Sequence, residues 1–460
     1  MLLKSKDKID VKIIVYKTEN ELVKHLKLDL DKQIKELIDE GFSKEKIKES
    51  DLSLNIGGNF FPKLEYVHIK FNFLFSSILK KLGKKDNCIY YKINCNKIDF
   101  FKDVDFEFKE KDNDSSLNDK NYIFFSEVNM SYCKFKNEFN LSKIVFNNDF
   151  RMLHSIFENG IYFYEVYFYK KSIFYSSLFN NRVYFSNSLF NDEAEFTDTI
   201  FFCDINFSDI YYIHSILLDN IHCPDNDIKL FISTSRCYDS RIKISYISLK
   251  NTVLYKLIFK DCDIGDIDLI GSSINNFELI NSDYNNFKNW QTARILKNEE
   301  LKKSNNIKAL EYEAIEVNLY RKELLKKKNK RVRDIADIAS ICLGHIYSSN
   351  CQNWIQALGI TLLSIFVIFS IFYTNNLDTF NIFIYLQNII QDVQTDNYWY
   401  RFIEYLIPTK YEHIMLYMKL ETIPLYKKLF GALVYFLGKI SFWYGSVHII
   451  QSFRKFNRVS

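Results

Sequence analysis

Residues 157–207 read FENGIYFYEVYFYKKSIFYSSLFNNRVYFSNSLFNDEAEFTDTIFFCDINF. Phe recurs in this stretch at alternating spacings of six and five residues. The same spacing extends upstream to Phe124, so that sixteen consecutive positions follow it, and thirteen of them are Phe. With 42 Phe among 460 residues, chance would place one or two in sixteen fixed positions. The stretch therefore carries a true period of eleven residues, which indicates a repeat architecture.

The Phe residues of this block are predicted to form the interior of the fold. They are Phe124, Phe135, Phe146, Phe157, Phe163, Phe168, Phe174, Phe179, Phe185, Phe190, Phe196, Phe201 and Phe207. The residue two positions earlier is mostly apolar or small, and such pairs point to the same side of an extended chain. A period of five or six fits neither a helix nor a continuous strand. The structure that fits this period is a series of short strands separated by regular corners, which predicts a solenoid.

A second block keeps a strict spacing of five. Its predicted core residues are Leu249, Leu254, Phe259, Ile264, Leu269, Ile274 and Leu279. Cys262-Asp263-Ile264 and Ile267-Asp268-Leu269 each place Asp directly before an apolar residue. This unit resembles that of the pentapeptide-repeat proteins, and the Phe block resembles an aromatic variant with alternating spacing.

The resemblance implies a right-handed quadrilateral parallel β-helix with four repeats to a coil. The Phe block would then form about four coils and the second block about two. The Phe block departs from the family directly before the core residue, where Tyr162, Tyr167, Ile173 and Leu178 replace the usual Asp or Asn. These apolar side chains would lie outside, which predicts a covered face.

The pattern along the chain predicts four regions: an N-terminal helical cap at 1–55, the β-helix at 56–290, an amphipathic basic helical connector at 291–345 and a membrane domain at 346–460. In the cap, Thr18 and Glu21 form a capping box before an amphipathic helix that ends near Gly41. Residues 107–121 indicate a solvated loop. The period fades between 212 and 241, which we interpret as degenerate coils.

Two stretches near the end of the chain are typical of membrane helices. Residues 354–373 carry no charge and are long enough to cross a hydrocarbon layer of about 30 Å. Residues 429–453 form a second candidate, interrupted by Lys439 and His448. The basic residues predicted to lie at the membrane surface flank the pair: Lys326, Lys327, Lys328, Lys330, Arg331, Arg333, Arg454 and Lys455. The positive-inside rule then predicts a multi-pass protein of the inner (cytoplasmic) membrane with the β-helix in the cytoplasm.

Lys439 is the candidate functional residue within the membrane. A charge near the middle of a membrane helix is costly and is usually kept for a reason, such as a pore, an ion pair or a subunit contact. The alternative is a lysine that snorkels or faces a polar groove beside Tyr435 and Ser441. Residues 379–391 are too short to span and are either a re-entrant pore helix or an interfacial helix near Trp399.

The sequence predicts no catalytic, cofactor-binding or metal-binding site. Gly-rich phosphate loops and Ser or His catalytic motifs are missing from it, and its nine Cys include no C-x-x-C pair. The acidic cluster Asp261, Asp263, Asp266 and Asp268 could suggest a calcium site, but solvated corners are the better interpretation. A net charge of +4 is too small to indicate a nucleic-acid partner.

We therefore expect a non-enzymatic, membrane-anchored scaffold whose cytoplasmic β-helix serves protein–protein interaction or self-association. Its expected partners are the lipid bilayer and either an unknown protein or further copies of the chain, with a homo-oligomer left open. The alternative is an oligomeric ion-channel-like or transport-related membrane protein in which the repeat domain is regulatory.

Overall fold

The structure is a computed structural model. It describes residues 11–40, 42–56, 64–70, 73–82, 88–89, 91–105, 122–225, 227–234, 241–350, 352–374, 393, 396–407, 410–420 and 423–457. The chain divides into two compact units, Met1–Ile295 and Leu296–Ser460. The predicted loop at 107–121 and the short segment at 379–391 lie outside the described residues.

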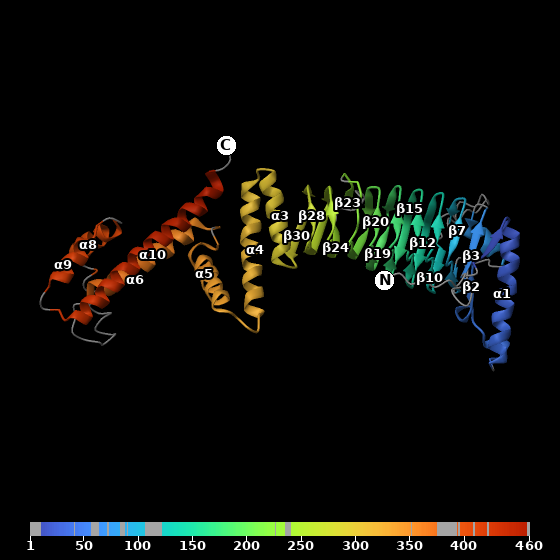
Figure 1. Cartoon of the computed structure of the whole chain (residues 1–460), viewed down its shortest axis with the longest axis horizontal. Helices are drawn as coiled ribbons and strands as arrows, with labels where there is room; N and C mark the ends of the chain where they lie inside the picture. Colours follow the sequence, from blue (N-terminus) through green and yellow to red (C-terminus); the bar gives the residue numbers. More distant parts are fainter. Residues whose placement is uncertain are drawn as a thin grey trace, which may run out of the picture. The chain divides into compact units, whose positions relative to one another are not determined.

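The first unit is a parallel β-solenoid of about seven turns, whose coils stack between β2 and β30 (Figure 1). Its strands up to the middle of the Phe block are β1 (Val11–Tyr16), β2 (Ser53–Asn55), β3 (Leu64–Ile69), β4 (Phe73–Leu74), β5 (Cys88–Ile89), β6 (Lys92–Asn94), β7 (Ile98–Phe100), β8 (Val104–Asp105), β9 (Tyr122–Phe124), β10 (Val128–Asn129), β11 (Lys134–Phe135), β12 (Phe139–Phe146), β13 (Phe150–Arg151), β14 (Ile156–Phe157) and β15 (Ile161–Phe168). The later strands are β16 (Ser172–Ile173), β17 (Leu178–Phe179), β18 (Val183–Ser186), β19 (Leu189–Glu195), β20 (Ile200–Phe201), β21 (Ile205–Ile210), β22 (Tyr212–Leu217), β23 (Lys229–Thr234), β24 (Ile242–Ser248), β25 (Val253–Leu254), β26 (Lys256–Lys260), β27 (Cys262–Asp268), β28 (Ser273–Ile274), β29 (Phe277–Ile280) and β30 (Asp283–Phe287).

The register between coils gives the number of repeats in each turn. Phe163 pairs with Phe185, twenty-two residues later, which is four repeats of alternating six and five. In the second block Ile244 pairs with Ile264, twenty residues later, which is four repeats of five. The prediction of a parallel β-helix with four repeats to a coil is therefore confirmed. β22 and β23 keep the strand pairing through the stretch where the sequence period fades.

Stacked Phe rings fill the interior of the solenoid. In one column Phe157 lies 4.8 Å from Phe135 and 4.8 Å from Phe179, centroid to centroid, with the rings nearly parallel. Neighbouring columns meet edge to face, as Phe163 and Phe174 do at 5.9 Å. Both arrangements suit the ring quadrupole. The predicted core residues are at most 1% exposed, except that Leu279 in the last coil is half-buried.

Small polar side chains two residues before the Phe bond the backbone inside the coil. Ser155 Oγ donates to Met130 O (3.0 Å), and Ser177 Oγ donates to Met152 O (2.7 Å). Ser177 Oγ also accepts from Ser155 N at 3.1 Å. Since a buried polar group without a partner is costly, this column shows why small hydroxyl residues suit the inward position.

Every second corner of the solenoid uses a left-handed residue. These residues recur every eleven positions in the Phe block: Tyr132, Lys143, His154, Glu165, Ser176, Asn187, Asp198, Asp209 and Asn220. They recur every ten positions at Asn251, Asp261, Gly271 and Asn281. Each of these residues lies two positions after an inward-facing apolar residue. The eleven-residue spacing of the Phe block and the ten-residue spacing of the second block therefore end in the same kind of corner. Asn and Asp suit this backbone region, which explains their frequency there.

The N-terminal end of the solenoid is covered by α1 (Glu19–Asp39). The Thr18–Glu21 capping box is present, as predicted. Gln33 bonds both the backbone N and O of Ser53 at 2.8 Å, which satisfies polar groups of the strand β2 beneath the helix. The cap is not purely helical, because Val11–Tyr16 forms the parallel strand β1 against β3. Two 3₁₀ turns, Lys44–Lys46 and Glu49–Asp51, and the helix α2 (Phe75–Lys81) complete this end.

At the other end of the solenoid the chain becomes helical. Thr292 Oγ1 accepts from Leu269 N (2.8 Å), so the start of α3 (Trp290–Lys302) caps the last coils. The predicted connector is broken at Ser304, which is left-handed, and again between α4 and α5. The further helices of the described residues are α4 (Asn306–Lys326), α5 (Val332–Ser348), α6 (Trp354–Thr374), α8 (Asp396–Leu406), α9 (Glu412–Lys419) and α10 (Leu425–Asn457).

Candidate functional site

Apolar side chains point outward around the middle coils of the solenoid. Tyr162 pairs with Tyr184, Tyr167 with Leu189, Ile173 with Glu195 and Leu178 with Ile200, each in a different ladder. Successive repeats turn a corner and present these residues on different sides of the coil, so they do not form a single face, and the covering of any one side stays a prediction. The outward apolar residues form a belt around the coils.

The most aromatic part of this belt is the ladder that contains Tyr162 and Tyr184. Their rings stack at 5.9 Å, and Tyr184 is 36% exposed. The ladder continues through Asn206 to Phe231. The ladder borders a depression of about 340 Å³, lined by Tyr184, Asn206, Phe231 and Ile258, with Arg182, Asp204 and Lys229 as its charged residues. Aromatic residues and Arg are enriched in protein-binding surfaces.

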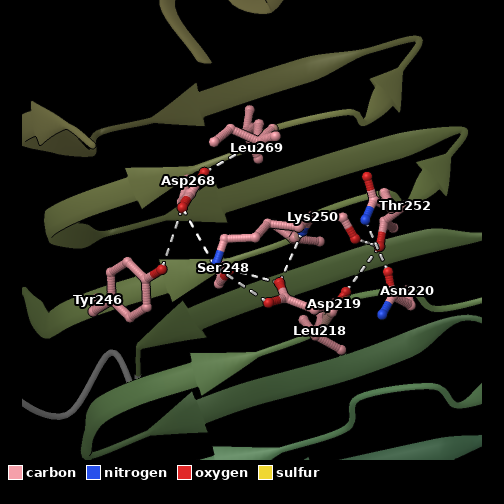
Figure 2. Close-up of polar contacts among 12 residues, drawn as sticks. Leu218, Asp219, Asn220, Tyr246, Ser248, Lys250, Thr252, Asp268 and Leu269 are labelled. Atoms are coloured by element: carbon pink, nitrogen blue, oxygen red, sulfur yellow. Dashed lines mark hydrogen bonds and ion pairs between the residues drawn. The ribbon is translucent and has the colours of Figure 1, made fainter. Parts of the chain in front are cut away.

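A polar network crosses another side of the solenoid, in the coils after the Phe block (Figure 2). Asp219 Oδ1 accepts from Ser248 Oγ (2.5 Å) and from Lys250 N (2.8 Å). Lys250 Nζ lies between two carboxylates, 3.4 Å from Asp219 and 3.5 Å from Asp268. Burial alone would lower the pKa of Lys250, but Asp219, Tyr246 and Asp268 together outweigh it and raise the pKa. Sequence reasoning missed this network because Asp219 and Asp268 are far apart in the chain.

Asp268 is the most deeply buried carboxylate of the network. It is 3% exposed, and its Oδ1 accepts from Asn289 Nδ2 at 2.7 Å and from Ile270 N at 3.2 Å. Tyr246 Oη donates to the other oxygen at 3.5 Å. Its lone pairs are thus used within the fold, and the arrangement joins successive coils.

The other aspartates of the acidic cluster, Asp261, Asp263 and Asp266, each have a different partner within the fold. Asp263 pairs with Arg241 (3.1 Å), Asp266 lies 3.7 Å from Lys288, and Asp261 accepts from Asn281 Nδ2 at 2.6 Å. Within the described residues no group of three or more His, Cys, Asp or Glu could hold a metal ion.

Six cysteines whose side chains the structure describes are free thiols: Cys95, Cys133, Cys203, Cys223, Cys262 and Cys342. Burial raises the pKa of the Cys133 and Cys262 thiols to about 12. A thiol with so high a pKa is a poor nucleophile, because the thiolate is the reactive form.

Among the described residues of the second unit, two helices are long and apolar enough to cross a membrane, Trp354–Tyr373 in α6 and Leu425–Phe453 in α10. The buried shares of their most apolar windows are 33% and 28%, whereas a core helix of a soluble protein is mostly buried. The exposed apolar side chains include Ile355, Leu358, Leu363, Val367, Leu429, Phe430, Leu433, Phe436, Ile440, Trp443, Val447 and Ile450. In a membrane, lipid chains would cover this apolar surface, which would otherwise be exposed to water.

The two helices pack closely and are joined by hydroxyl groups. A Cβ atom at Gly445 would collide with the Thr361 side chain, so glycine permits the approach of α10 to α6. Ser441 Oγ lies 2.9 Å from Ser364 Oγ and 2.8 Å from Tyr347 Oη, which links α10, α6 and α5.

Lys439 of α10 is enclosed by the segment that connects the two helices. It is 5% exposed, and its Nζ donates to Tyr405 O (2.6 Å) and Ile407 O (2.9 Å) at the end of α8. The Tyr405, Tyr435 and Tyr411 rings lie 4.6, 5.4 and 6.0 Å from Nζ. The last carbonyls of a helix have no partner within it, and cations stabilise that end. Lys439 thus caps α8 and is surrounded by π-faces.

α8 itself packs against α6 through aromatic side chains. Tyr398 Oη lies 2.6 Å from Ser370 Oγ, and Phe369 contacts Phe402 and Tyr405 at 5.5 and 5.1 Å between ring centroids. Trp399, the predicted interfacial anchor, is 43% exposed on the same helix. α8 is thus packed onto the hairpin.

At the opposite end of the hairpin lies a cavity of about 660 Å³ between α4, α5 and α10. His448 and Glu313 are among its lining residues. His448 Nδ1 lies 2.9 Å from Ser348 Oγ, so this ring nitrogen already has a partner.

The lysines and arginines predicted to lie at the membrane surface come before the hairpin and at its end in the chain. Lys326, Lys327, Lys328, Lys330, Arg331 and Arg333 are exposed at the end of α4 and the start of α5. Lys327 Nζ pairs with Asp334 (2.8 Å), and this lysine holds the pKa of the Asp334 carboxyl below its usual value. Arg454 and Lys455 fall in the last turns of α10.

These features define the class of the protein, a β-solenoid repeat protein with two candidate membrane-spanning helices. Comparison of the chain with protein-family models, with curated proteins and with solved structures finds no match.

Proposed function

We propose that the protein is a non-enzymatic, membrane-anchored scaffold whose solenoid presents its aromatic outward ladder to a protein partner or to another copy of the chain. The observation that carries the proposal is the presence, in one chain, of an apolar helical hairpin and of a solenoid with outward tyrosines.

We also propose that the solenoid is a divergent pentapeptide-repeat domain. The twenty-residue coils of the second block support this, since they hold four units of five residues with Asp before the core residue at Asp263 and Asp268. The Phe block is the aromatic variant of the same coil, lengthened to twenty-two residues.

The proposed location is the inner membrane, with the solenoid in the cytoplasm. The exposed basic residues before α6 and the basic residues at the end of α10 support it, because Lys and Arg are enriched on the cytoplasmic side of membrane helices. The connecting segment, with α8 and α9, would then face outward.

A reporter that works only in the cytoplasm is expected to be active when inserted at residue 300 or fused to the C-terminus, and inactive beside Asn397. Reporter activity at each site in cells is the measurement. Activity at all three sites would mean that α10 does not span, and the hairpin topology would be wrong.

A photo-crosslinking residue in place of Tyr184 is expected to form an adduct with another protein or a second copy of the chain, because this side chain is 36% exposed in the aromatic ladder. The adduct is measured by mass after irradiation of intact membranes. The control replaces Lys170, which is exposed outside that ladder. Equal or absent adducts at positions 184 and 170 would contradict the scaffold proposal.

A further inference from the structure

One side of α5 is apolar along its whole length and exposed. Val332, Ile335, Leu343 and Ile346 are 85%, 57%, 49% and 54% exposed. With Ala339, they follow one another at spacings of three and four, which places them on one face of the helix. Side chains of this size along one helix face in water require a partner.

The other side of α5 is fixed against the hairpin. Ser348 and Gly344 are buried, and Tyr347 Oη lies 2.8 Å from Ser441 of α10. Gln356, in the first turn of α6, donates to Ile346 O at 2.8 Å. The end of α5 is therefore held at the start of a membrane-spanning candidate, and its apolar face points away from these contacts.

Positive charge gathers where α5 begins. Lys326, Lys328, Lys330, Arg331 and Arg333 are exposed before and within its first turn. The nearby carboxylate of Asp334 is bonded by Lys327 Nζ (2.8 Å) and by Arg331 N (2.8 Å), so it offsets little of this charge. A helix with a basic start and an apolar face next to a membrane span has the features of an interfacial helix.

We propose that α5 lies in the surface of an anionic lipid leaflet, with Ile335, Leu343 and Ile346 inserted among the lipid chains and the basic residues at the headgroups. This inference rests on the proposed membrane hairpin. It adds a second, charge-dependent contact with the bilayer, which would fix the orientation of the helices that follow the solenoid. Continuity with α6 and the complementary charge favour lipid over a protein partner as the occupant of this face.

The test uses the full chain in liposomes of phosphatidylcholine with 30% phosphatidylglycerol, carrying a photo-crosslinking residue at one position. We expect phospholipid adducts at Ile335 and Leu343, detected by mass. Leu363, which is 59% exposed on α6, is the positive control. Lys322, exposed on α4, is the negative control.

The charge dependence has its own variant. Combined Lys326→Gln, Lys328→Gln and Lys330→Gln changes are expected to reduce the lipid adduct at Ile335 several-fold in anionic liposomes, and not in pure phosphatidylcholine. An unchanged adduct in anionic liposomes would overturn the role of the basic residues.

The controls separate this inference from the proposed function. Lipid adducts at Leu363 without any at Ile335 and Leu343 would overturn the inference and leave the membrane hairpin standing. Adducts of Leu343 with a second copy or another protein would make α5 a protein interface and also overturn it. Loss of the Leu363 adduct would contradict the hairpin itself.

Discussion

Phe179→Ala is expected to lower the free energy of unfolding of the solenoid by about 3–5 kcal/mol, the usual cost of truncating a buried Phe. Phe179 is 1% exposed, and its ring stacks between Phe157 at 4.8 Å and Phe201 at 5.0 Å. Its removal leaves a cavity that the neighbouring coils cannot close, because their spacing is set by strand pairing. Urea unfolding of the detergent-solubilised chain, followed by brief proteolysis of the unfolded fraction, measures the change.

Lys170→Ala is the matched control. Lys170 is exposed, and its truncation is expected to change the free energy of unfolding by no more than about 0.5 kcal/mol. Because coils contact mainly their neighbours, the loss at Phe179 should first appear as opening of the coils around it. Equal changes in the free energy of unfolding for the two variants would contradict the assignment of the Phe residues to the interior of the coil.

The coil could be predicted from the sequence because each short repeat has a recognisable residue pattern. The same pattern recurs in every coil of the stack. Phe163 and Phe185 occupy the same place in successive coils, so one period gives both the burial and the pairing. β1 was missed, since a single strand such as Val11–Tyr16 carries no period and lies next to a strong helix signal. The corners follow the sequence expectation, since Tyr162 and Ile173 belong to successive repeats and lie in different ladders.

The surroundings of Lys439 were beyond prediction. A charge in an apolar helix is visible in the sequence, but its partners are backbone carbonyls of Tyr405 and Ile407, which have no residue signature. The network of Asp219, Lys250 and Asp268 was hidden in the same way, because Asp219 and Lys250 are 31 residues apart in the chain and meet only when the coils stack. Local composition shows that such groups need partners, and only the tertiary fold shows which ones they have.

Lys439→Leu is expected to weaken the packing of α8 on the hairpin, since it removes the donor to Tyr405 O while leaving this carbonyl enclosed by tyrosine rings. Ile407 O keeps the hydrogen bond from Lys410 N at 3.2 Å. Leaving a buried acceptor unsatisfied costs about 1–3 kcal/mol. Backbone amides of α8 should then exchange hydrogen roughly 10- to 100-fold faster in the detergent-solubilised protein, because that exchange follows the free energy of local opening. Hydrogen exchange with mass detection over residues 396–407 is the measurement.

The matched control is Lys419→Leu, which removes an exposed lysine from α9 and should leave exchange in α8 unchanged. Lys439→Glu separates a structural lysine from a pore lysine, because a carboxylate cannot donate to Tyr405 O but would reverse the charge of a conducting ring. For a scaffold, the Glu variant should speed hydrogen exchange in α8 as the Leu variant does. Bilayers that contain the unchanged protein or the Glu variant should show no single-channel current. A reproducible conductance of the unchanged protein, with ion selectivity altered by Lys439→Glu and exchange in α8 unaffected, would make the chain a channel and contradict the scaffold.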